Sequence, residues 1–218
     1  MSELEIIGAD LSTFVRSCRI ACMEKGADYD LTFDYPNGIA DLQSEAHLAL
    51  HPFGRMPAMR HDGFVLFEAS AICRYIDDTF EGPALVPGER RQAAVMEQWI
   101  SASNDYVATH LTRNYIIKYA FPQTEDGAPD MEAINEALPK VRDTLKILNG
   151  ALEDGPYLLG QTPYIADFFL LPILDYVASM PEGADLLGAA PNVARFRDAF
   201  SKRASYAATL PDRLRQAA

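Results

Sequence analysis

The sequence of 218 residues predicts a mixed α/β unit followed by an all-helical unit. Up to about Phe80, short strand-like runs alternate with helix-like runs, whereas from Glu89 onward apolar residues recur at helical spacing. Between them, residues 81–90 read EGPALVPGER, and their two prolines and two glycines are typical of a linker. We therefore expect one domain at 1–80 and a second at 91–218.

The first unit opens with a strand candidate at 4–9 and a helix candidate at 12–26. Ser12 or Thr13 can cap this helix, because a side-chain oxygen there can accept a hydrogen bond from a free N–H group of the first turn. A second strand candidate, DYDLTFDY, covers residues 28–35. These elements make a βαβ arrangement.

Two further strand candidates flank residues 61–63, which read HDG, because Asp-Gly is a frequent two-residue hairpin turn. Pro57 stands at the entry of the first of these strands, although proline cannot donate to a sheet ladder and is usual only at edges or strand starts. A helix candidate at 70–80 closes the unit. The predicted order is βαβ-ββα.

Helical periodicity dominates the rest of the chain. The candidates are 89–121, 131–153, 164–180 and 191–210, the last of which can form one or two helices. The third run is apolar nearly all round, so we expect it at the centre of its core. Pro139 falls inside the second run, where it can kink the helix.

Composition excludes several functions. The net charge of −12 disfavours nucleic acid and anionic membrane surfaces as partners. No apolar run approaches the roughly 20 residues of a membrane span, and no signal peptide opens the chain. The three cysteines form neither a CxxC pair nor a metal spacing, which predicts reduced thiols, a cytoplasmic protein and no metal site.

Four segments resemble, in this order, the cytosolic glutathione S-transferase family. They are STFVRSCRIACMEKG (12–26), HPFGRMPAMRHDGFVLFEASAICRYI (51–76), IADFFLLP (165–172) and ASYAATLP (204–211). The first is similar to the first helix of serine-type members, nearest to the phi class and its bacterial relatives. The resemblance implies a thioredoxin-like, glutathione-binding domain at 1–80 and an all-helical domain at 91–218 that contributes the electrophile site.

The resemblance implies that glutathione is the co-substrate. Pro57 would be a cis-proline that presents the main chain of Met56 to glutathione, which pairs with it like an added strand. Arg55 would lie near an anionic or amide part of the ligand. From the residues alone, an edge-strand proline and a surface arginine are the alternative.

The same segment supplies the partners of the γ-glutamyl end. Glu68 would meet the α-ammonium group, and the N–H groups of Ala69 and Ser70, at a helix start, would hold the carboxylate. Without the resemblance, Glu68 is a glutamate in the first turn of a helix.

By resemblance, Ser12 is the catalytic candidate that stabilises the glutathione thiolate. A free thiol has a pKa near 8.5, and a hydroxyl hydrogen bond at a helix N-terminus favours the charged form. Lowering that pKa by about two units requires roughly 2.7 kcal/mol, and one charge-assisted hydrogen bond supplies about 1.5–3 kcal/mol. Two alternatives stay open: Thr13 could take this role, and Ser12 could serve only as a helix cap.

The sequence departs from the family pattern at three points. Ala69 stands where the family has a serine. The segment DLQSE offers only Gln43 where phi-class members have basic residues for the glycyl carboxylate, so Arg55 is the candidate replacement. Tyr164 stands where a Ser or Thr usually caps the central helix, so we expect Asp167 to bind free N–H groups there without a reciprocal side chain.

The implied reaction is transfer of the glutathione sulfur to an electrophilic small molecule, as in detoxification. The candidates for binding this second substrate are Phe14, His110, Arg113 and Asn114. The alternative is a non-catalytic glutathione-binding or assembly protein of the same fold. The resemblance also implies a homodimer, and Phe53, a large apolar residue in a turn, could insert into the partner.

Overall fold

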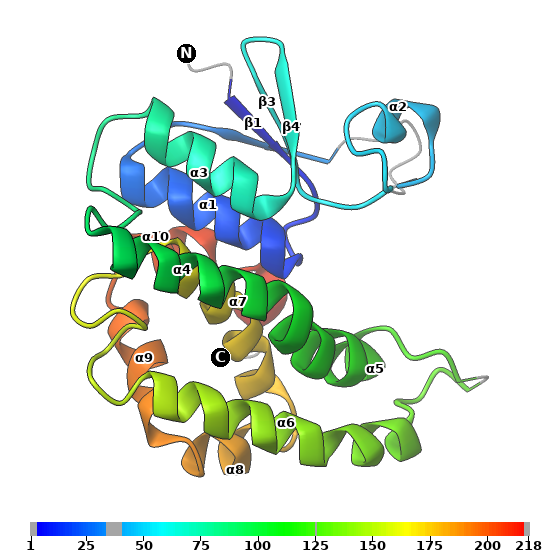
Figure 1. Cartoon of the computed structure of the whole chain (residues 1–218). Helices are drawn as coiled ribbons and strands as arrows, with labels where there is room; N and C mark the ends of the chain where they lie inside the picture. Colours follow the sequence, from blue (N-terminus) through cyan, green and yellow to red (C-terminus); the bar gives the residue numbers. More distant parts are fainter. Residues whose placement is uncertain (1–3, 34–40, 125, 216–218) are drawn as a thin grey trace. The chain divides into compact units, whose positions relative to one another are not determined.

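The computed structural model describes residues 4–33, 41–124 and 126–215 (Figure 1). The chain divides into two compact units, the first built from Met1–Pro87 with Ala204–Gln216 and the second from Gly88–Arg203. The sequence-based division grouped the segment from 204 onward with the helical unit, whereas the structure groups it with the first unit. Among the described residues, no helix is both long enough and apolar enough to cross a bilayer.

A mixed four-stranded sheet forms the centre of the first unit. Its strands are β1 (Leu4–Ile7), β2 (Asp30–Thr32), β3 (Ala58–His61) and β4 (Phe64–Phe67), in the order β2-β1-β3-β4. β1 pairs parallel with β2 and antiparallel with β3, which pairs antiparallel with β4. Of the strand predicted at 28–35, residues 30–32 pair in the sheet, and residues 34 and 35 lie outside the described residues.

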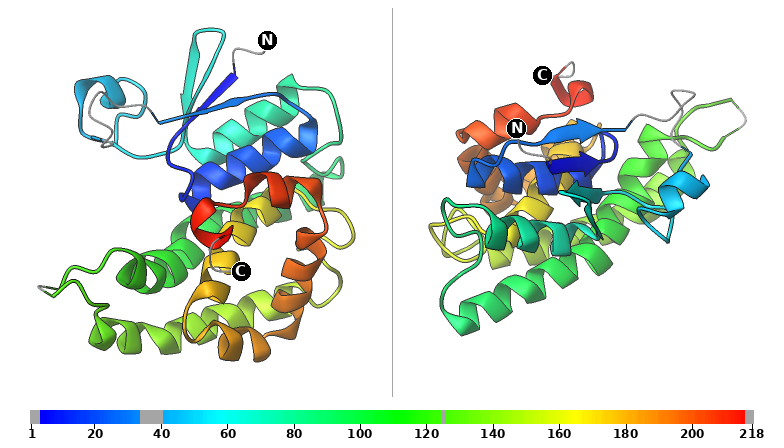
Figure 2. Two further views of the ribbon diagram at one scale, coloured as in Figure 1. Left: turned by 180° about the vertical axis from the view of Figure 1, so that it is seen from behind. Right: turned by 90° about the horizontal axis from the view of Figure 1, so that it is seen from above.

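The helices of the first unit confirm the predicted thioredoxin-like order. α1 (Thr13–Lys25) and α3 (Ala69–Thr79) pack side by side against the sheet, and α10 (Ala204–Thr209) lies along α1 (Figures 1 and 2). The short helices α2 (Glu45–Leu48) and α11 (Asp212–Arg215) were not predicted. Their length of four residues is too short for a periodic signal.

Local signals explain the ends of these elements. Gly26 ends α1 with φ 68°, the left-handed conformation that glycine adopts at little cost. Asp62 and Gly63 join β3 to β4 with φ 49° and 82°. Positive φ at both central residues is the requirement of the tight turn that matches strand twist, so the hairpin prediction is confirmed.

The second unit is helical. Its elements are α4 (Arg90–Ala102), η1 (Ser103–Ile116), α5 (Ile117–Ala120), α6 (Met131–Ala151), α7 (Ile165–Ser179), α8 (Gly183–Gly188) and α9 (Pro191–Ser201). The helix predicted at 89–121 runs unbroken from α4 to α5, but its middle, η1, is a π-helix, a rare form that is frequent at functional sites.

α7 forms the core of the second unit. Every residue from Ile165 to Val177 is buried, as its uniformly apolar sequence predicted, and the helix packs against α4, η1, α8 and α9. Asp167, fully buried, accepts hydrogen bonds at 2.8 Å from the N–H groups of Leu158 and Tyr164. The Asp167 N–H donates in turn to the main-chain carbonyl of Tyr164 at 2.9 Å. Burial raises the pKa of Asp167 to about 7, although the hydrogen bonds to its carboxylate act in the opposite direction.

Candidate active site

The strand register brings three distant segments of the chain to one end of the sheet. Ile7 of β1 pairs with Ala58 of β3, which pairs in turn with Phe67 of β4. Gly8, which follows β1, Pro57, which precedes β3, and Glu68, which follows β4, are the next residues of the three segments at this end of the sheet. Because α1 begins shortly after β1 and α3 directly after β4, two helix N-termini also lie at this end and favour negative charge there.

Met56 lies against the loop that follows β1. Its Sδ accepts a hydrogen bond from the Ala9 N–H at 3.3 Å. A Cβ atom at Gly8 would come within 3.2 Å of Met56 Cβ and 2.4 Å of a Val15 methyl group, so this close approach requires glycine. The Met56–Pro57 bond is cis, as predicted. Among the described residues, no backbone N–H or carbonyl group of a turn or loop forms a hydrogen bond with the main chain of Met56. This main chain can therefore pair with a peptide ligand.

Arg55 combines a fixed main chain with an exposed position. Its carbonyl oxygen lies 2.7 Å from Nε2 of the fully buried His47. Because a carbonyl can only accept, His47 carries its proton on Nε2 and donates it here. Arg55 itself is exposed. Its guanidinium is therefore available to an anionic part of a ligand.

Glu68 precedes α3 with φ 72° and ψ 118°. A positive φ is uncommon for a non-glycine residue and is most often kept at functional sites. The Glu68 side chain makes no capping hydrogen bond to α3, and the residue is exposed, so its carboxylate is available to a cationic group. The N–H groups of Ala69 and Ser70 open the helix and have no intrahelical partner, so they can receive an anion.

Ser12 is the N-cap of α1. Its Oγ accepts a hydrogen bond from the Val15 N–H at 3.4 Å. Because a hydroxyl has two acceptor lone pairs and one proton, this bond leaves the proton free to be donated to a thiolate. Ser12 is half-buried, whereas Thr13 is only 8% exposed. Accessibility therefore favours Ser12 over Thr13.

His51 is buried and packs against two phenylalanine rings near the site. Its ring lies 5.0 Å from the Phe67 ring and 6.3 Å from the Phe53 ring. Burial lowers the pKa of His51, while the nearby Glu68 carboxylate acts in the opposite direction. The imidazole is therefore neutral near pH 7, because its pKa lies below the ordinary value of about 6.5. Because a neutral His51 does not neutralise the negative charge of Glu68, that carboxylate can bind a cationic group of a ligand.

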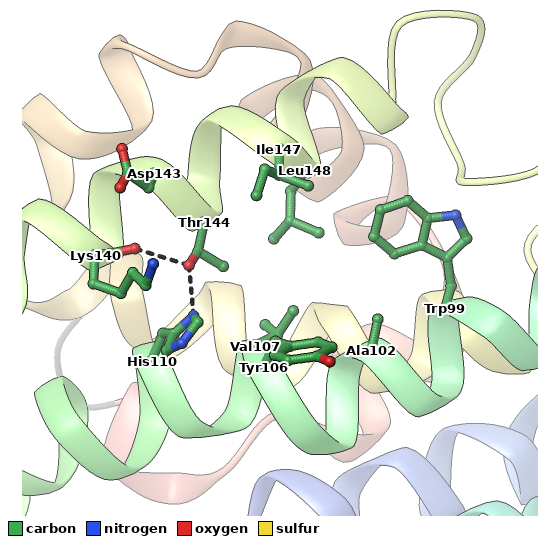
Figure 3. A pocket seen from close by; sticks show the side chains of 10 residues that line it. All are labelled: Trp99, Ala102, Tyr106, Val107, His110, Lys140, Asp143, Thr144, Ile147 and Leu148. Carbon is green, nitrogen blue, oxygen red and sulfur yellow. Dashed lines mark hydrogen bonds between the residues drawn. The ribbon is translucent and has the colours of Figure 1, made fainter.

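The second unit contains an apolar cavity of about 300 Å³ between α6 and the helix formed by α4 and η1 (Figure 3). It is lined by Trp99, Ala102, Tyr106, Val107, His110, Lys140, Asp143, Thr144, Ile147 and Leu148. His110 Nδ1 lies 2.9 Å from Thr144 Oγ1, which donates to the Lys140 carbonyl at 2.8 Å. Thr144 therefore accepts the Nδ1 proton of His110. Burial, with a contribution from Lys140, lowers the pKa of His110 and keeps it neutral.

The predicted residues for the second substrate lie in both units. Phe14 is half-buried on α1 in the first unit, and the other three share η1 in the second. Of those three, only His110 lines the cavity. Arg113 and Asn114 are exposed, and Arg113 donates to Thr109 Oγ1 at 2.9 Å.

Two family models match the chain. They are the glutathione S-transferase N-terminal domain, over residues 11–79, and the glutathione S-transferase C-terminal domain, over residues 131–199. The chain belongs to the glutathione S-transferase family. A relative in Arabidopsis thaliana, glutathione S-transferase F14, is 30% identical over 203 residues, which are 89% of this chain and 78% of the relative. The probable glutathione S-transferase GSTF2 of Oryza sativa subsp. japonica is 27% identical over 193 residues, which are 88% of this chain and 84% of the relative.

Solved structures agree with this assignment. Glutathione transferase F7 from Populus trichocarpa matches with a TM-score of 0.83 and 25% identity, over 94% of this chain and 97% of the other. Glutathione S-transferase I from maize, solved with an atrazine glutathione conjugate, matches with a TM-score of 0.82 and 26% identity, over 94% of this chain and 95% of the maize chain. With phi-class plant enzymes among its relatives, this chain is a glutathione transferase, and the non-catalytic alternative gains no support.

The cysteines of this transferase lie in its core. Cys18, Cys22 and Cys73 are buried and unpaired. Burial raises the pKa of Cys18 and of Cys22, which keeps both as thiols. In α1 they therefore act as apolar core residues, as their i, i+4 spacing indicated.

Besides the short helices α2 and α11, sequence reasoning missed two features of the transferase's first unit. One is His51, for which no local pattern exists. The other is the packing of the C-terminal segment on α1, where Arg16 and Arg19 are buried. Two arginines three residues apart on the apolar side of a helix were the available signal, because a buried arginine needs partners.

Proposed function

We propose that this glutathione transferase activates the glutathione thiolate at Ser12 for attack on an electrophilic small molecule. The observation that carries the proposal is the meeting of Ser12, Met56 and Glu68 at one end of the sheet, beside two helix N-termini. The thiol loses its proton, the sulfur forms a bond to the electrophilic carbon, and the leaving group departs with its electron pair. The proton of the thiol passes to solvent, and Ser12 keeps its own proton and donates a hydrogen bond from its hydroxyl to the thiolate, which favours ionisation.

The remaining residues hold the peptide. The main chain of Met56, next to Pro57, pairs with the cysteinyl part of glutathione. Glu68 binds the α-ammonium group, and the N–H groups of Ala69 and Ser70 bind the γ-glutamyl carboxylate. Arg55, exposed and basic, takes the glycyl carboxylate in place of the basic residues that this sequence lacks.

The electrophile is proposed to contact Phe14, with Arg113 and Asn114 as further candidates. The hydrogen bond from His110 to Thr144 favours a structural role for His110 over substrate binding. That the maize relative was solved with an atrazine glutathione conjugate supports a detoxifying conjugation reaction. We place the protein in the cytoplasm, because buried, unpaired cysteines suit a reducing compartment.

Isothermal calorimetry with glutathione tests the peptide site. Glu68→Gln keeps the side-chain shape but removes the charge that meets the ammonium group. We expect binding to weaken roughly tenfold to two-hundredfold, because a hydrogen bond to a charged group contributes about 1.5–3 kcal/mol. Glu132→Gln, an equal charge change at an exposed position of α6, should leave the affinity unchanged.

A panel of electrophiles, each assayed with and without glutathione, tests the reaction itself. Acceleration that requires glutathione supports the proposal. If the wild type binds glutathione in calorimetry but conjugates no electrophile, the non-catalytic alternative is correct instead.

We also propose a homodimer in which Phe53 enters the apolar cavity of a second copy. Phe53 is 70% exposed, an unusual position for a phenylalanine, and the cavity of about 300 Å³ is lined mainly by apolar groups (Figure 3). In a twofold dimer the same contact forms twice, once in each direction.

Sedimentation tests the dimer. Phe53→Ala should weaken dimerisation by at least about 800-fold, because central aromatic anchors contribute about 2 kcal/mol or more each and a twofold dimer loses two of them. Phe121→Ala, at another exposed phenylalanine, should leave the dimer intact. A wild-type monomer at micromolar concentration, or an unchanged dimer in Phe53→Ala, would contradict this arrangement.

A further inference from the structure

The C-terminal segment is bonded to α1 at Arg16, Arg19 and Glu24. Near its middle, the Arg19 guanidinium donates to the carbonyl groups of Ala208 at 3.4 Å and Thr209 at 3.5 Å. At the far end, the Ser205 hydroxyl donates to the Glu24 carboxylate. These contacts lie within the first unit, so they connect α10 directly to the helix that Ser12 caps.

One contact of this segment reaches the loop before Ser12. Oδ2 of Asp10 accepts a hydrogen bond from the Asp212 N–H at 3.1 Å, and Oδ1 of the same carboxylate pairs with Nη1 of Arg19. Arg19 is itself held, because its side chain is 9% exposed and its Nε donates to the Tyr29 hydroxyl at 3.1 Å. Asp10 thus joins the loop at once to α1 and to the C-terminal segment.

The loop from Gly8 to Ser12 is also held at its two ends, where the Gly8 N–H donates to the Thr32 carbonyl at 2.9 Å and the Ser12 carbonyl accepts from the Arg16 N–H at 3.0 Å. The Ala9 N–H is bound by Met56 Sδ, and the Ser12 N–H donates to the Ala9 carbonyl at 3.0 Å. Displacing a catalytic group by about 1 Å is enough to reduce a rate substantially, because hydrogen-bond strength to the developing charge depends on geometry. A restraint at Asp10, two residues before Ser12, therefore bears on thiolate stabilisation.

We propose that Asp10 is a positioning residue that holds Ser12 in place by joining its loop to Arg19 and to the C-terminal segment at Asp212. The inference rests on the proposed role of Ser12 as the donor to the thiolate. If so, the C-terminal segment, which is far from Ser12 in sequence, contributes to the pKa of the thiol of bound glutathione.

Asp10→Ala, with Ser205→Ala as matched control, tests the role. Each variant removes one hydrogen bond between the C-terminal segment and the rest of the first unit. Asp10→Ala also removes the ion pair with Arg19, and only Asp10 belongs to the Ser12 loop. In Asp10→Ala we expect the pKa of the bound thiol to rise and turnover at neutral pH to fall about two- to tenfold, with KM for glutathione nearly unchanged. Ser205→Ala should keep the wild-type thiol pKa and turnover.

The sign of the shift separates positioning from simple electrostatics. Removing a negative charge near a thiolate would by itself lower the thiol pKa. A lowered or unchanged pKa in Asp10→Ala therefore overturns the proposal, as does an equal rise in Ser205→Ala. If Asp10→Ala does not fold, Asp10→Asn replaces it, since the amide oxygen still accepts from Asp212 while the ion pair is lost. A smaller rise is then expected, and no rise overturns the role.

Ser12→Ala, measured in parallel, separates this inference from the proposed function. A raised thiol pKa in Ser12→Ala with a normal pKa in the Asp10 variants overturns only the positioning role. A normal pKa in Ser12→Ala overturns both proposals together.

Discussion

Replacing Ser12 by alanine should lower turnover at neutral pH by roughly tenfold to two-hundredfold while glutathione still binds. The substitution removes a charge-assisted hydrogen bond of about 1.5–3 kcal/mol, and that loss falls on the ionised form of the thiol. The peptide remains held by the Met56 main chain, Glu68 and the N–H groups that open α3. The pKa of the bound thiol should rise towards its free value near 8.5. Ultraviolet titration of the bound thiolate measures this shift directly.

Because Ser12 also accepts from the Val15 N–H, the same variant loses a helix cap. That loss costs about 0.5–2 kcal/mol of stability and must be separated from the catalytic effect. Asp130→Ala provides the control, since Asp130 caps α6 by accepting from the Ala133 N–H at 3.1 Å in the other unit. Asp130→Ala should be similarly destabilised with its thiol pKa and turnover intact.

Two results would contradict the role of Ser12. An unchanged thiol pKa with unchanged turnover would leave Ser12 as a cap only. Thr13→Val would then be the next variant, because it removes the neighbouring hydroxyl with little change in shape. A large loss of glutathione affinity in Ser12→Ala would instead indicate that Ser12 binds the peptide rather than the thiolate.

Local signals made much of the fold predictable. Ser12 and Gly26 bound α1 because capping depends on residues within one turn of the helix end. Asp62 and Gly63 form the β3–β4 turn for a similarly local reason. The division of the chain was not predictable in full, because the grouping of 204–216 with the first unit depends on partners nearly 200 residues away in sequence, such as Arg19 and Ala208.

Some residues of the candidate site were also predictable from local sequence, and others were not. Met56, Pro57 and Glu68 occur in one continuous, recognisable segment, so the sequence identified them together. Asp10 and His51 were missed, since nothing next to them in sequence reveals the partners of Asp10 or the burial of His51. The π-helix η1 was also missed, because the sequence there is compatible with an ordinary helix.

Replacing Asp167 by alanine should destabilise the protein by roughly 2–6 kcal/mol, because two buried N–H groups, of Leu158 and Tyr164, lose their acceptor at about 1–3 kcal/mol each. Urea unfolding measures this loss. Asp198→Ala is the control, since Asp198 is exposed and forms an i, i+4 ion pair with Lys202, a contact of about 0.5 kcal/mol. A cost below about 1 kcal/mol for Asp167→Ala would contradict the anchoring role.

The cost of Asp167→Ala should also depend on pH. Burial raises the pKa of Asp167 to about 7 in the folded state, above the value near 3.9 of an unfolded chain. The folded state therefore favours the protonated carboxyl, and its stabilising contribution is complete below the unfolded pKa and is lost as the pH rises through about 7. The difference in unfolding free energy between wild type and Asp167→Ala should accordingly be larger at about pH 5 than at about pH 8. Titrations of both proteins at the two pH values cancel the other ionisable groups, and a difference that grows with pH would show that Asp167 is held as a carboxylate instead.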